Sequence, residues 1–392
     1  DELHWSCRSI CRRAQVMHLQ NVDKQAFLDS DWQQRPRLFK RGLANVDLIE
    51  PEILAGLAME DGVDARIIEH RDQSWSVSHG PFEEYESLGE EDWTLLVQAV
   101  NEWMPDVHSL LQAFRFLPEW RIDDVMVSFS VAGGGVGPHV DEYDVFIVQG
   151  AGRRHWRVGA RQSTTPTYPC EDLKQIKESF DAVIDEVLEP GDVLYIPAGC
   201  PHDGIALEPC LNYSVGFRAP NQAEWLAQLA DMALQTEQLK QRYTDPNLLS
   251  DNPSHIVTEA QLSHVKQLLK SAIESSDFDE LILRAQSMSK RPLPEPELPM
   301  VAEQVPALLT MDNAAVVRTP GSHLLKHFDK PQYFANGELF TVTTEADALA
   351  KQLAELSDEK AITELAPLCV DMCGQELLAW LVNQGVIELL ID

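Results

Sequence analysis

Residues 128–150 read SFSVAGGGVGPHVDEYDVFIVQG and residues 189–204 read EPGDVLYIPAGCPHDG, and these two stretches carry the most specific pattern of the chain. In the first, a glycine-rich turn leads into an apolar run that begins near His139. In the second, a Pro-Gly turn, the apolar run 193–196 and a Pro/Gly loop precede His202. Both stretches predict β-strands whose turns present histidines.

The first stretch pairs His139 with Asp141, two positions further on. Residues two apart on a strand point to the same face, so both side chains can face inward. His202 would then come from a strand that is adjacent in space. An H-x-D triplet alone is more simply a chance match, and a lone histidine a surface residue. The flanking strands and the third side chain favour a metal site, because two imidazoles and one carboxylate are the ligands of non-haem Fe(II) oxygenases.

The region around these stretches is rich in short apolar runs separated by glycine and proline turns. We expect strands at residues 125–131, 139–149, 153–158, 182–188, 192–197 and 211–218. Many short strands with such turns indicate a mainly β fold, here a double-stranded β-helix, which is the jelly roll of the cupins. Upstream, helical spacing of apolar residues predicts helices at 23–31, 51–59 and 91–103, with short strands at 37–40, 65–70 and 75–78.

The overall composition narrows the class of protein. The chain has 392 residues, enough for two or three domains, and 44% hydrophobic residues, enough for sizeable cores. No apolar run is long enough to cross a membrane. A net charge of -32 argues against direct nucleic-acid binding, and is as well explained by solubility as by a basic protein partner. Seven cysteines without a dense framework suit a cytoplasmic protein.

The two ends of the chain differ in character from the predicted barrel. Residues 1–16 lack an initiator methionine and the apolar region of a signal peptide. We therefore expect a non-native leader before a barrel at 17–220. Broad apolar stripes predict a helical module at 221–291, with helices from 225, near Thr258 and at 277–288. A Pro-rich linker at 292–299 follows.

The last segment, residues 300–392, has the plan of a small mixed domain. It contains an Asn-Gly turn at 336–337, which predicts a hairpin over 333–340. Helices at 346–356 and 375–383 and a strand at 386–391 complete a winged-helix-like pattern. Its acidic residues provide no basic face for DNA, so we expect a structural or protein-binding role.

Residues 121–220 resemble the core of the JmjC-type 2-oxoglutarate oxygenases. The likeness is most specific in RIDDVMVSFSVAGGGVGPHVDEYDVFIVQGAGRRHWRVG and GDVLYIPAGCPHDG, and in NYSVGFRAP further on. With the helical module and the terminal winged-helix-like unit, nearly all of 17–392 is similar to the ribosomal oxygenases, and most of all to their bacterial branch. That branch hydroxylates an arginine of a basic large-subunit ribosomal protein, the sixteenth of the series.

The resemblance implies an Fe(II) centre held by His139, Asp141 and His202, with 2-oxoglutarate and O₂ as co-substrates. In the family, a cation on the strand after the H-x-D strand holds the distal carboxylate of 2-oxoglutarate. Arg154 occupies that place, and a guanidinium can grip a carboxylate at two points. Arg153 and Arg157 are the competitors. The positions that hydrogen-bond the co-substrate fall on Ser128 and Asn212, for which a bond to neighbouring backbone is the simpler alternative.

Substrate recognition is expected on the same wall of the barrel. Asp124, Met126 and Ser128 alternate along one strand, so Asp124 can pair with the guanidinium of a substrate arginine. Tyr143 and Met126 would pack on its methylenes and Ser214 would add a hydrogen bond, as in the arginine-hydroxylating branch. The alternative is that Asp124 is a surface residue at the start of a strand and Tyr143 a core aromatic. The resemblance also implies a homodimer formed through the helical module.

Other activities fit parts of the pattern. Histidine hydroxylation and lysine demethylation occur in the same superfamily. A cupin that uses a metal without 2-oxoglutarate would not need Arg154, and a binding protein with a vestigial barrel would not need an intact metal triad. We therefore expect an arginine hydroxylase, and dependence on 2-oxoglutarate separates it from the other cupins.

Overall fold

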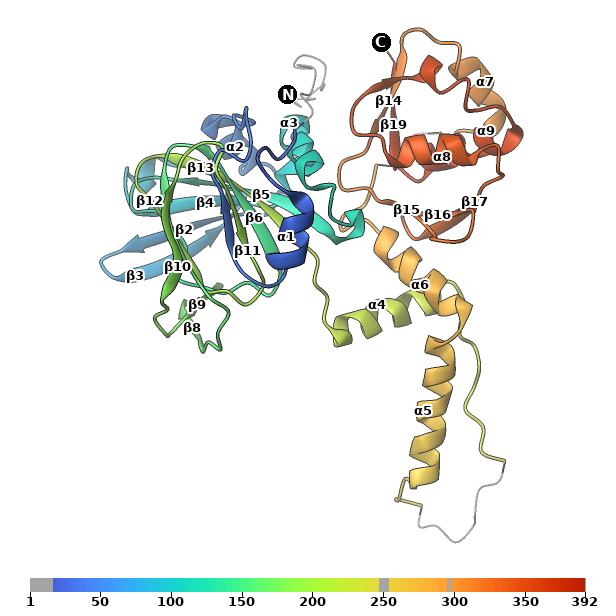
Figure 1. Ribbon diagram of the computed structural model, residues 1–392, viewed down its shortest axis with the longest axis horizontal. Helices are drawn as coiled ribbons and strands as arrows, with labels where there is room; N and C mark the ends of the chain where they lie inside the picture. Colours follow the sequence, from blue (N-terminus) through green and yellow to red (C-terminus); the bar gives the residue numbers. More distant parts are fainter. Residues whose placement is uncertain (1–16, 247–253, 295, 297, 392) are drawn as a thin grey trace. The chain divides into compact units, whose positions relative to one another are not determined.

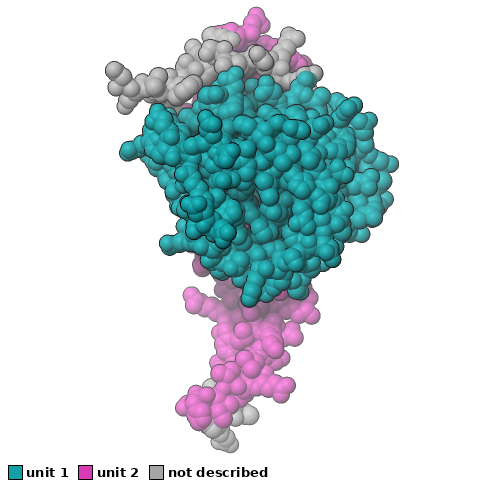
Figure 2. Space-filling model, turned by 90° about the vertical axis from the view of Figure 1, so that its left-hand side faces the viewer, with its two compact units in different colours: residues 1–219 teal, residues 220–392 magenta. Residues whose placement is uncertain are grey.

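The computed structural model describes residues 17–246, 254–294, 296 and 298–391. The chain divides into two compact units, one ending at residue 219 and the other beginning at residue 220 (Figure 2). The predicted leader, residues 1–16, lies outside the described residues. Within the described part of the chain, no helix combines the length and the apolar character that a membrane span requires.

The first unit is built on a large antiparallel sheet with the strand order β1-β11-β6-β13-β5-β4-β2-β3 (Figure 1). Strands far apart in the sequence are therefore neighbours in space. The bounds of these strands are β1 (Arg37–Phe39), β2 (Ala65–Arg71), β3 (Ser74–His79), β4 (Trp93–Val97), β5 (Ile122–Ser130), β6 (Asp144–Ala151), β11 (Val193–Ile196) and β13 (Cys210–Phe217).

A smaller sheet of order β10-β7-β12 completes the double-stranded β-helix that the sequence predicted. Its edge strand β12 begins at His202, and an isolated bridge pairs His202 with His139. The strands of this sheet, together with the hairpin β8-β9, are β7 (Arg154–Gly159), β8 (Pro166–Cys170), β9 (Leu173–Ile176), β10 (Ala182–Leu188) and β12 (His202–Ala206).

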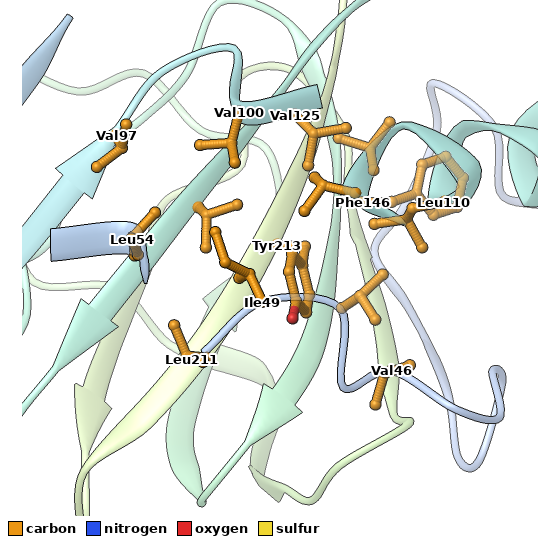
Figure 3. Close-up of a cluster of buried hydrophobic side chains, with 14 of the residues drawn as sticks. Val46, Ile49, Leu54, Val97, Val100, Leu110, Val125, Phe146, Leu211 and Tyr213 are labelled. Atoms are coloured by element: carbon orange, nitrogen blue, oxygen red, sulfur yellow. The ribbon is translucent and has the colours of Figure 1, made fainter. Parts of the chain in front are cut away.

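Alternation along the central strands separates a packed face from the interior of the barrel. On β5, Val125 and Val127 belong to the large core, which also contains Phe146 and Tyr213 (Figure 3). Their neighbours of opposite parity, among them Asp124 and Ser128, point to the other face. The polar side chains of these strands therefore line the interior of the barrel, because the apolar side chains of the same strands pack into the core on the opposite face.

Short N-terminal helices supply the opposite wall of this core. Phe27 of α1, Leu54 of α2 and Val107 of α3 are all buried in it. The Asp23 side chain caps α1 by accepting from the Ala26 N–H, and α2 and α3 each start with a proline. The bounds are α1 (Lys24–Ser30), α2 (Pro51–Leu57), α3 (Pro105–Ser109), η1 (Glu86–Leu88), η2 (Val100–Glu102), η3 (Leu110–Phe114) and η4 (Glu119–Arg121).

Two predictions about these elements are wrong. Residues 91–103 do not form a helix, since they contain β4, whose five residues are all buried, followed by η2. A central strand buried on both faces loses the alternation that distinguishes it from a helix. The predicted strand 139–149 begins only at Asp144, so His139 and Asp141 lie in the loop before β6 rather than on one face of it.

The second unit begins with three helices, α4 (Gln222–Gln235), α5 (Glu259–Ile273) and α6 (Ser276–Ser287). The predicted capping box at the start of α5 is confirmed: the Thr258 hydroxyl accepts from the Gln261 N–H, and the Gln261 side chain accepts from the Thr258 N–H. Helices α4 and α6 share a small core around Leu229 and Leu281. Helix α5 has no buried residue of its own.

The remainder of the second unit is a mixed α/β assembly around a core of its own. The predicted hairpin is confirmed, with Asn336 and Gly337 at positive φ between β16 and β17. The predicted C-terminal helices and strand correspond to α8, α9 and β19. The elements are η5 (Ala302–Gln304), α7 (Val305–Leu308), β14 (Ala314–Arg318), β15 (Leu324–Lys326), β16 (Gln332–Ala335), β17 (Glu338–Thr341), α8 (Asp347–Ala354), β18 (Lys360–Ala361), η6 (Ile362–Glu364), α9 (Met372–Asn383) and β19 (Ile387–Ile391).

Candidate metal and substrate site

Three side chains from two distant segments meet inside the barrel. One ligand atom each from His139, Asp141 and His202 lies within 4.8 Å of the others. The Nε2 of His202 is 3.5 Å from the Oδ2 of Asp141. Among the described residues, this is the group of metal-ligating side chains that is close enough to hold an ion. The structure thus brings together the three residues that the sequence singled out.

The main chain, rather than a regular strand, fixes this arrangement. The His139 N–H donates to the His202 carbonyl at 3.0 Å, and the His202 N–H donates back to the His139 carbonyl at 2.9 Å. The Gly199 N–H donates to the Asp141 carbonyl at 2.9 Å, which ties the loop of Asp141 to the loop that precedes β12. Main-chain hydrogen bonds from the His139–Asp141 loop to the start of β12 and to the loop before it therefore fix the ligands, rather than alternation along one strand.

Both imidazoles are oriented by their Nδ1 atoms. His139 Nδ1 lies 2.9 Å from the Gly137 carbonyl oxygen, and His202 Nδ1 lies 3.0 Å from that of Cys200. A carbonyl can only accept, so each Nδ1 carries the hydrogen and each Nε2 is left with a free lone pair. A hydrogen bond from the ring nitrogen that does not bind the metal commonly orients metal-binding histidines in this way.

The protonation state of His202 suits a ligand. Its side chain is 2% exposed, and burial together with the neighbouring His139 lowers its pKa to about 4. The imidazole is therefore neutral at physiological pH, which is the form that donates a lone pair to a metal.

Arg154 is a buried cation on β7, deeper in the same barrel. It is 3% exposed, and its Nη2 donates to the Gly204 carbonyl at 3.0 Å. Its Nη1 lies 3.3 Å from the Ser130 hydroxyl and 3.4 Å from the Asn212 Oδ1. Burial lowers the pKa of this guanidinium, which nevertheless stays charged. Within the described parts of the chain it forms no ion pair, although the Asp203 carboxylate acts on it at longer range, and its buried Nε has no hydrogen-bond partner.

The two competing arginines point elsewhere. Arg153 is exposed and pairs with Glu208 at 3.0 Å, while Arg157 lies 3.6 Å from Asp185. Arg154 shares its face of β7 with Trp156, and its guanidinium lies 5.1 Å from the centre of that ring. The alternation on β7 therefore leaves Arg154 as the cation of the interior among these three arginines.

The polar network around Arg154 contains one residue that was predicted from the sequence and three that were not. Asn212 is placed as expected, and its amide donates to the Gln149 Oε1 at 2.8 Å. The hydroxyl that Arg154 contacts is that of Ser130, two residues beyond the predicted Ser128 on the same face of β5. Ser130 in turn lies 2.9 Å from the Thr94 hydroxyl. The even-numbered alternation on β5 already pointed to Ser130, whereas Thr94 and Gln149 come from other strands.

The predicted substrate residues lie along one wall. Asp124 and Met126 of β5 face the interior with Ser128, and Met126 pairs across the sheet with Ser214 of β13. Met126 packs on an apolar patch with Leu96 and Val136, and its sulfur accepts from the Gln98 amide at 3.3 Å. Residues of β5 and Ser214 of β13 are thus neighbours in space, although the two strands are far apart in the chain.

Gly216 of β13 is a residue of this wall that the sequence did not indicate. A Cβ atom at this position would lie 3.9 Å from the Asp124 Oδ1 and 3.9 Å from the Tyr143 ring. The glycine therefore lies beside both the carboxylate and the aromatic ring. The negative charge of Asp141, followed by burial and by Asp124, raises the pKa of Tyr143, so its hydroxyl stays protonated.

Comparison with known proteins places this site in a family. The family description "JmjC domain" matches residues 109–225. The ribosomal protein uL16 3-hydroxylase of Escherichia coli is 43% identical over 92% of this chain and 95% of its own length. The chain belongs to the ribosomal oxygenase family. A probable ribosomal oxygenase of Haemophilus influenzae is 33% identical over 81% of this chain and 82% of its own length.

Solved structures of this ribosomal oxygenase family agree with the fold. The X-ray structure of E. coli YcfD superposes with a TM-score of 0.86 at 41% identity, covering 96% of this chain and 100% of the other. A second YcfD structure, a complex with cobalt and 2-oxoglutarate, has a TM-score of 0.82 at 41% identity and covers 95% and 99%. The mainly β, cupin-type fold expected from the sequence is therefore confirmed.

Proposed function

We propose that this protein is an Fe(II)- and 2-oxoglutarate-dependent dioxygenase that hydroxylates an arginine of a large-subunit ribosomal protein. One observation carries the proposal: the His139–Asp141–His202 cluster shares the barrel interior with Arg154, which is buried and has an unused Nε–H. The family supports it, since a 43% identical relative is a uL16 3-hydroxylase and a solved relative binds cobalt and 2-oxoglutarate.

The residues present fit the metal. Two neutral imidazole nitrogens and one carboxylate oxygen form the three-ligand set of non-haem Fe(II) oxygenases, which leaves positions open for other ligands. When bound, Fe(II) with 2-oxoglutarate and O₂ supplies the oxidant that turns a substrate C–H into C–OH, while 2-oxoglutarate becomes succinate and CO₂. His139, Asp141 and His202 would hold the ion, and the hydrogen bonds at Nδ1 keep both rings in position.

The residues also fit the co-substrate. A buried guanidinium with an unused Nε–H needs an acceptor, and a dicarboxylate supplies one. Arg154 would hold the distal carboxylate, with Ser130 and Asn212 fixing the orientation of the guanidinium. Ser128, predicted from the resemblance to contact 2-oxoglutarate directly, is 4% exposed on the same face and remains a proposed contact.

The substrate wall suits a cationic side chain. Asp124 offers a carboxylate for an arginine guanidinium, and the Tyr143 ring and Met126 offer apolar surface for its methylenes. Ser214, half-buried beside Met126, would add a hydrogen bond. The E. coli relative is a 3-hydroxylase, which supports the β-carbon as the reacting position. A net charge of -32 is compatible with a basic ribosomal partner, which the enzyme would meet in the cytoplasm.

We further propose that the second unit contains a helical dimerisation module (221–291), a linker (292–299) and a winged-helix-like domain (300–392). Helix α5 supports the dimer, because Leu262, Val265, Leu269 and Ile273 form a stripe along it and all four are exposed. Such a stripe is stable when another helix covers it, and a second copy of the chain supplies an identical helix.

Intact-mass spectrometry tests the activity. The protein, Fe(II) and 2-oxoglutarate are incubated in air with unmodified ribosomal proteins, and fragmentation then locates the oxygen. We expect one added oxygen on an arginine of one large-subunit protein, lost without 2-oxoglutarate and with His139→Ala. Oxygen on histidine, or loss of a methyl group when methyl-lysine proteins are supplied instead, would assign the enzyme to another activity of the superfamily. A metal-loaded protein that forms neither product nor succinate would contradict the proposal and favour a different metal cupin or a binding protein.

A further inference from the structure

Arg66 of β2 faces the interior of the barrel beside the substrate wall. It pairs across the sheet with Leu96 of β4, which pairs with Ser128 of β5, which in turn pairs with Asn212 of β13. Residues paired in this way point to the same face of a sheet. With strands about 4.8 Å apart, the Cα of Arg66 lies roughly 10 Å from that of Ser128.

The next inward residue of β2 fixes the position of Arg66 more closely. Ile68 packs with Leu96 and Met126 in one apolar patch, so this end of β2 borders the proposed substrate wall. Arg66 is also among the charged side chains whose field reaches the Tyr143 hydroxyl, after Asp141 and Asp124. Arg66 therefore borders the proposed substrate wall, in register with Leu96 and Ser128 on the inward face of the sheet.

The guanidinium of Arg66 has unused donors. Its Nε is buried and has no hydrogen-bond partner among the described residues. The nearby histidine on β3, His79, is engaged with Asp172 at 3.1 Å, and Arg71 of β2 pairs with Glu69 at 2.9 Å. A buried donor without a partner costs free energy, which a ligand acceptor would recover.

The chemistry of this position selects an uncharged acceptor. A substrate guanidinium is repelled by Arg66 and attracted by Asp124, so the two side chains together set the direction in which the polypeptide lies. An acidic segment is disfavoured by the overall charge of -32. A main-chain carbonyl next to the target arginine carries the required lone pairs and is present in every polypeptide.

We propose that Arg66 binds a main-chain carbonyl of the polypeptide whose arginine is hydroxylated. This inference rests on the proposed function and extends it from the reacting side chain to the backbone that carries it. Arg66 is then a substrate-positioning residue. Its contact is present in both the bound substrate and the transition state, so its loss changes KM rather than kcat.

The test uses the full-length enzyme and a peptide that contains the hydroxylated arginine. Arg66→Met keeps the apolar stem and removes the donors, while Arg66→Lys restores a single charged donor. Arg71→Met is the matched control, because it removes an arginine from the same strand but from the opposite face. Thermal unfolding of each variant monitors folding. We expect KM for the peptide to rise about tenfold in Arg66→Met, with partial rescue in Arg66→Lys and no change in Arg71→Met.

A second measurement identifies the partner atom. Amides flanking the target arginine are replaced one at a time by trans-alkenes, which lack the carbonyl. One replacement should raise KM about tenfold for the wild-type enzyme and leave it unchanged for Arg66→Met, because the contact is already lost. If the wild-type enzyme oxidises the peptide but Arg66→Met leaves KM unchanged, the inference is overturned and the proposed function stands. The same holds if the effect of Arg66→Met on KM simply adds to that of every amide replacement. A wild-type enzyme that oxidises no ribosomal peptide would overturn the proposed function and the inference with it.

Discussion

His139 and His202 exchange two main-chain hydrogen bonds, of 3.0 and 2.9 Å, and their rings lie with centroids 4.1 Å apart. These two hydrogen bonds fix the main chain at His139 and at His202 before any ion binds. The imidazoles are then held by their Nδ1 contacts to Gly137 and Cys200. The metal site is thus preorganised by the chain itself, and replacing one side chain leaves the backbone bridge intact.

The first prediction concerns this preorganisation. His202→Ala should abolish binding of Fe(II), or of Co(II) as a probe, because two remaining ligands hold a divalent ion poorly, while the backbone bridge preserves the fold. Visible absorption on Co(II) titration measures the affinity, and circular dichroism checks the fold. His155→Ala is the control, since His155 pairs with Asp185 away from the cluster. Co(II) bound equally well by His202→Ala would exclude His202 as a ligand.

The second prediction concerns Arg154. Arg154→Met should raise KM for 2-oxoglutarate on the order of a hundredfold, since a charge-assisted contact to a carboxylate contributes ~3 kcal/mol. Arg154→Lys keeps the charge without the forked donors and should fall between that variant and the wild type. Succinate formation at varied 2-oxoglutarate measures this, with Arg153→Met as the outward-facing control. If Arg153→Met showed the larger effect, the co-substrate would bind elsewhere.

The third prediction concerns Asp124. Asp124→Ala should lose hydroxylation of the ribosomal substrate, since the guanidinium loses its partner, and should still bind metal and 2-oxoglutarate. Mass spectrometry of the product and Co(II) titration separate the two effects. Asp123→Asn serves as control, because the Asp123 carboxylate pairs with Arg218 at 3.4 Å. Hydroxylation at the normal rate by Asp124→Ala would remove Asp124 from the substrate site.

The fourth prediction concerns the gap at Gly216. Gly216→Ala should be tolerated, because the new Cβ meets Asp124 and Tyr143 at ordinary contact distances of 3.9 Å. Gly216→Val should reduce kcat/KM for the peptide by at least tenfold, because its methyl groups enter the space between the carboxylate and the ring. Peptide kinetics and thermal unfolding would be compared for both variants. Equal activity of the valine variant would show that the substrate does not pass between Asp124 and Tyr143.

The fifth prediction concerns helix α5. Leu269→Glu should weaken self-association at least tenfold, because burying one leucine contributes about 1.5–3 kcal/mol and a buried carboxylate opposes it. Ser271→Glu adds the same charge on the other side of the helix and should leave the dimer intact. Sedimentation equilibrium distinguishes the two. A wild-type chain that remains a monomer at high concentration would remove the proposed dimer.

Several features of the fold and the site could be predicted from the sequence, because they depend on local patterns. Alternation on β5, β7 and β13 separated the apolar core from the polar interior, while Arg154 was chosen over Arg153 from the family resemblance. The Asn-Gly hairpin and the Thr258 capping box follow from the chemistry of a few adjacent residues. The helix expected at 91–103 was wrong, since β4 is buried on both faces and its sequence carries no alternation.

The sequence by itself determined which residue types are available: two histidines and an aspartate with oxygenase spacing, an arginine on the following strand and an excess of acidic residues. Only the tertiary structure decided how they meet. His139 and Asp141 lie in a loop held by hydrogen bonds to His202 and Gly199, and Ser130 contacts Arg154. Gly216 and Arg66 border the proposed substrate wall. The physical reason is that strand pairing joins residues far apart in the chain, and no local pattern records which strands become neighbours.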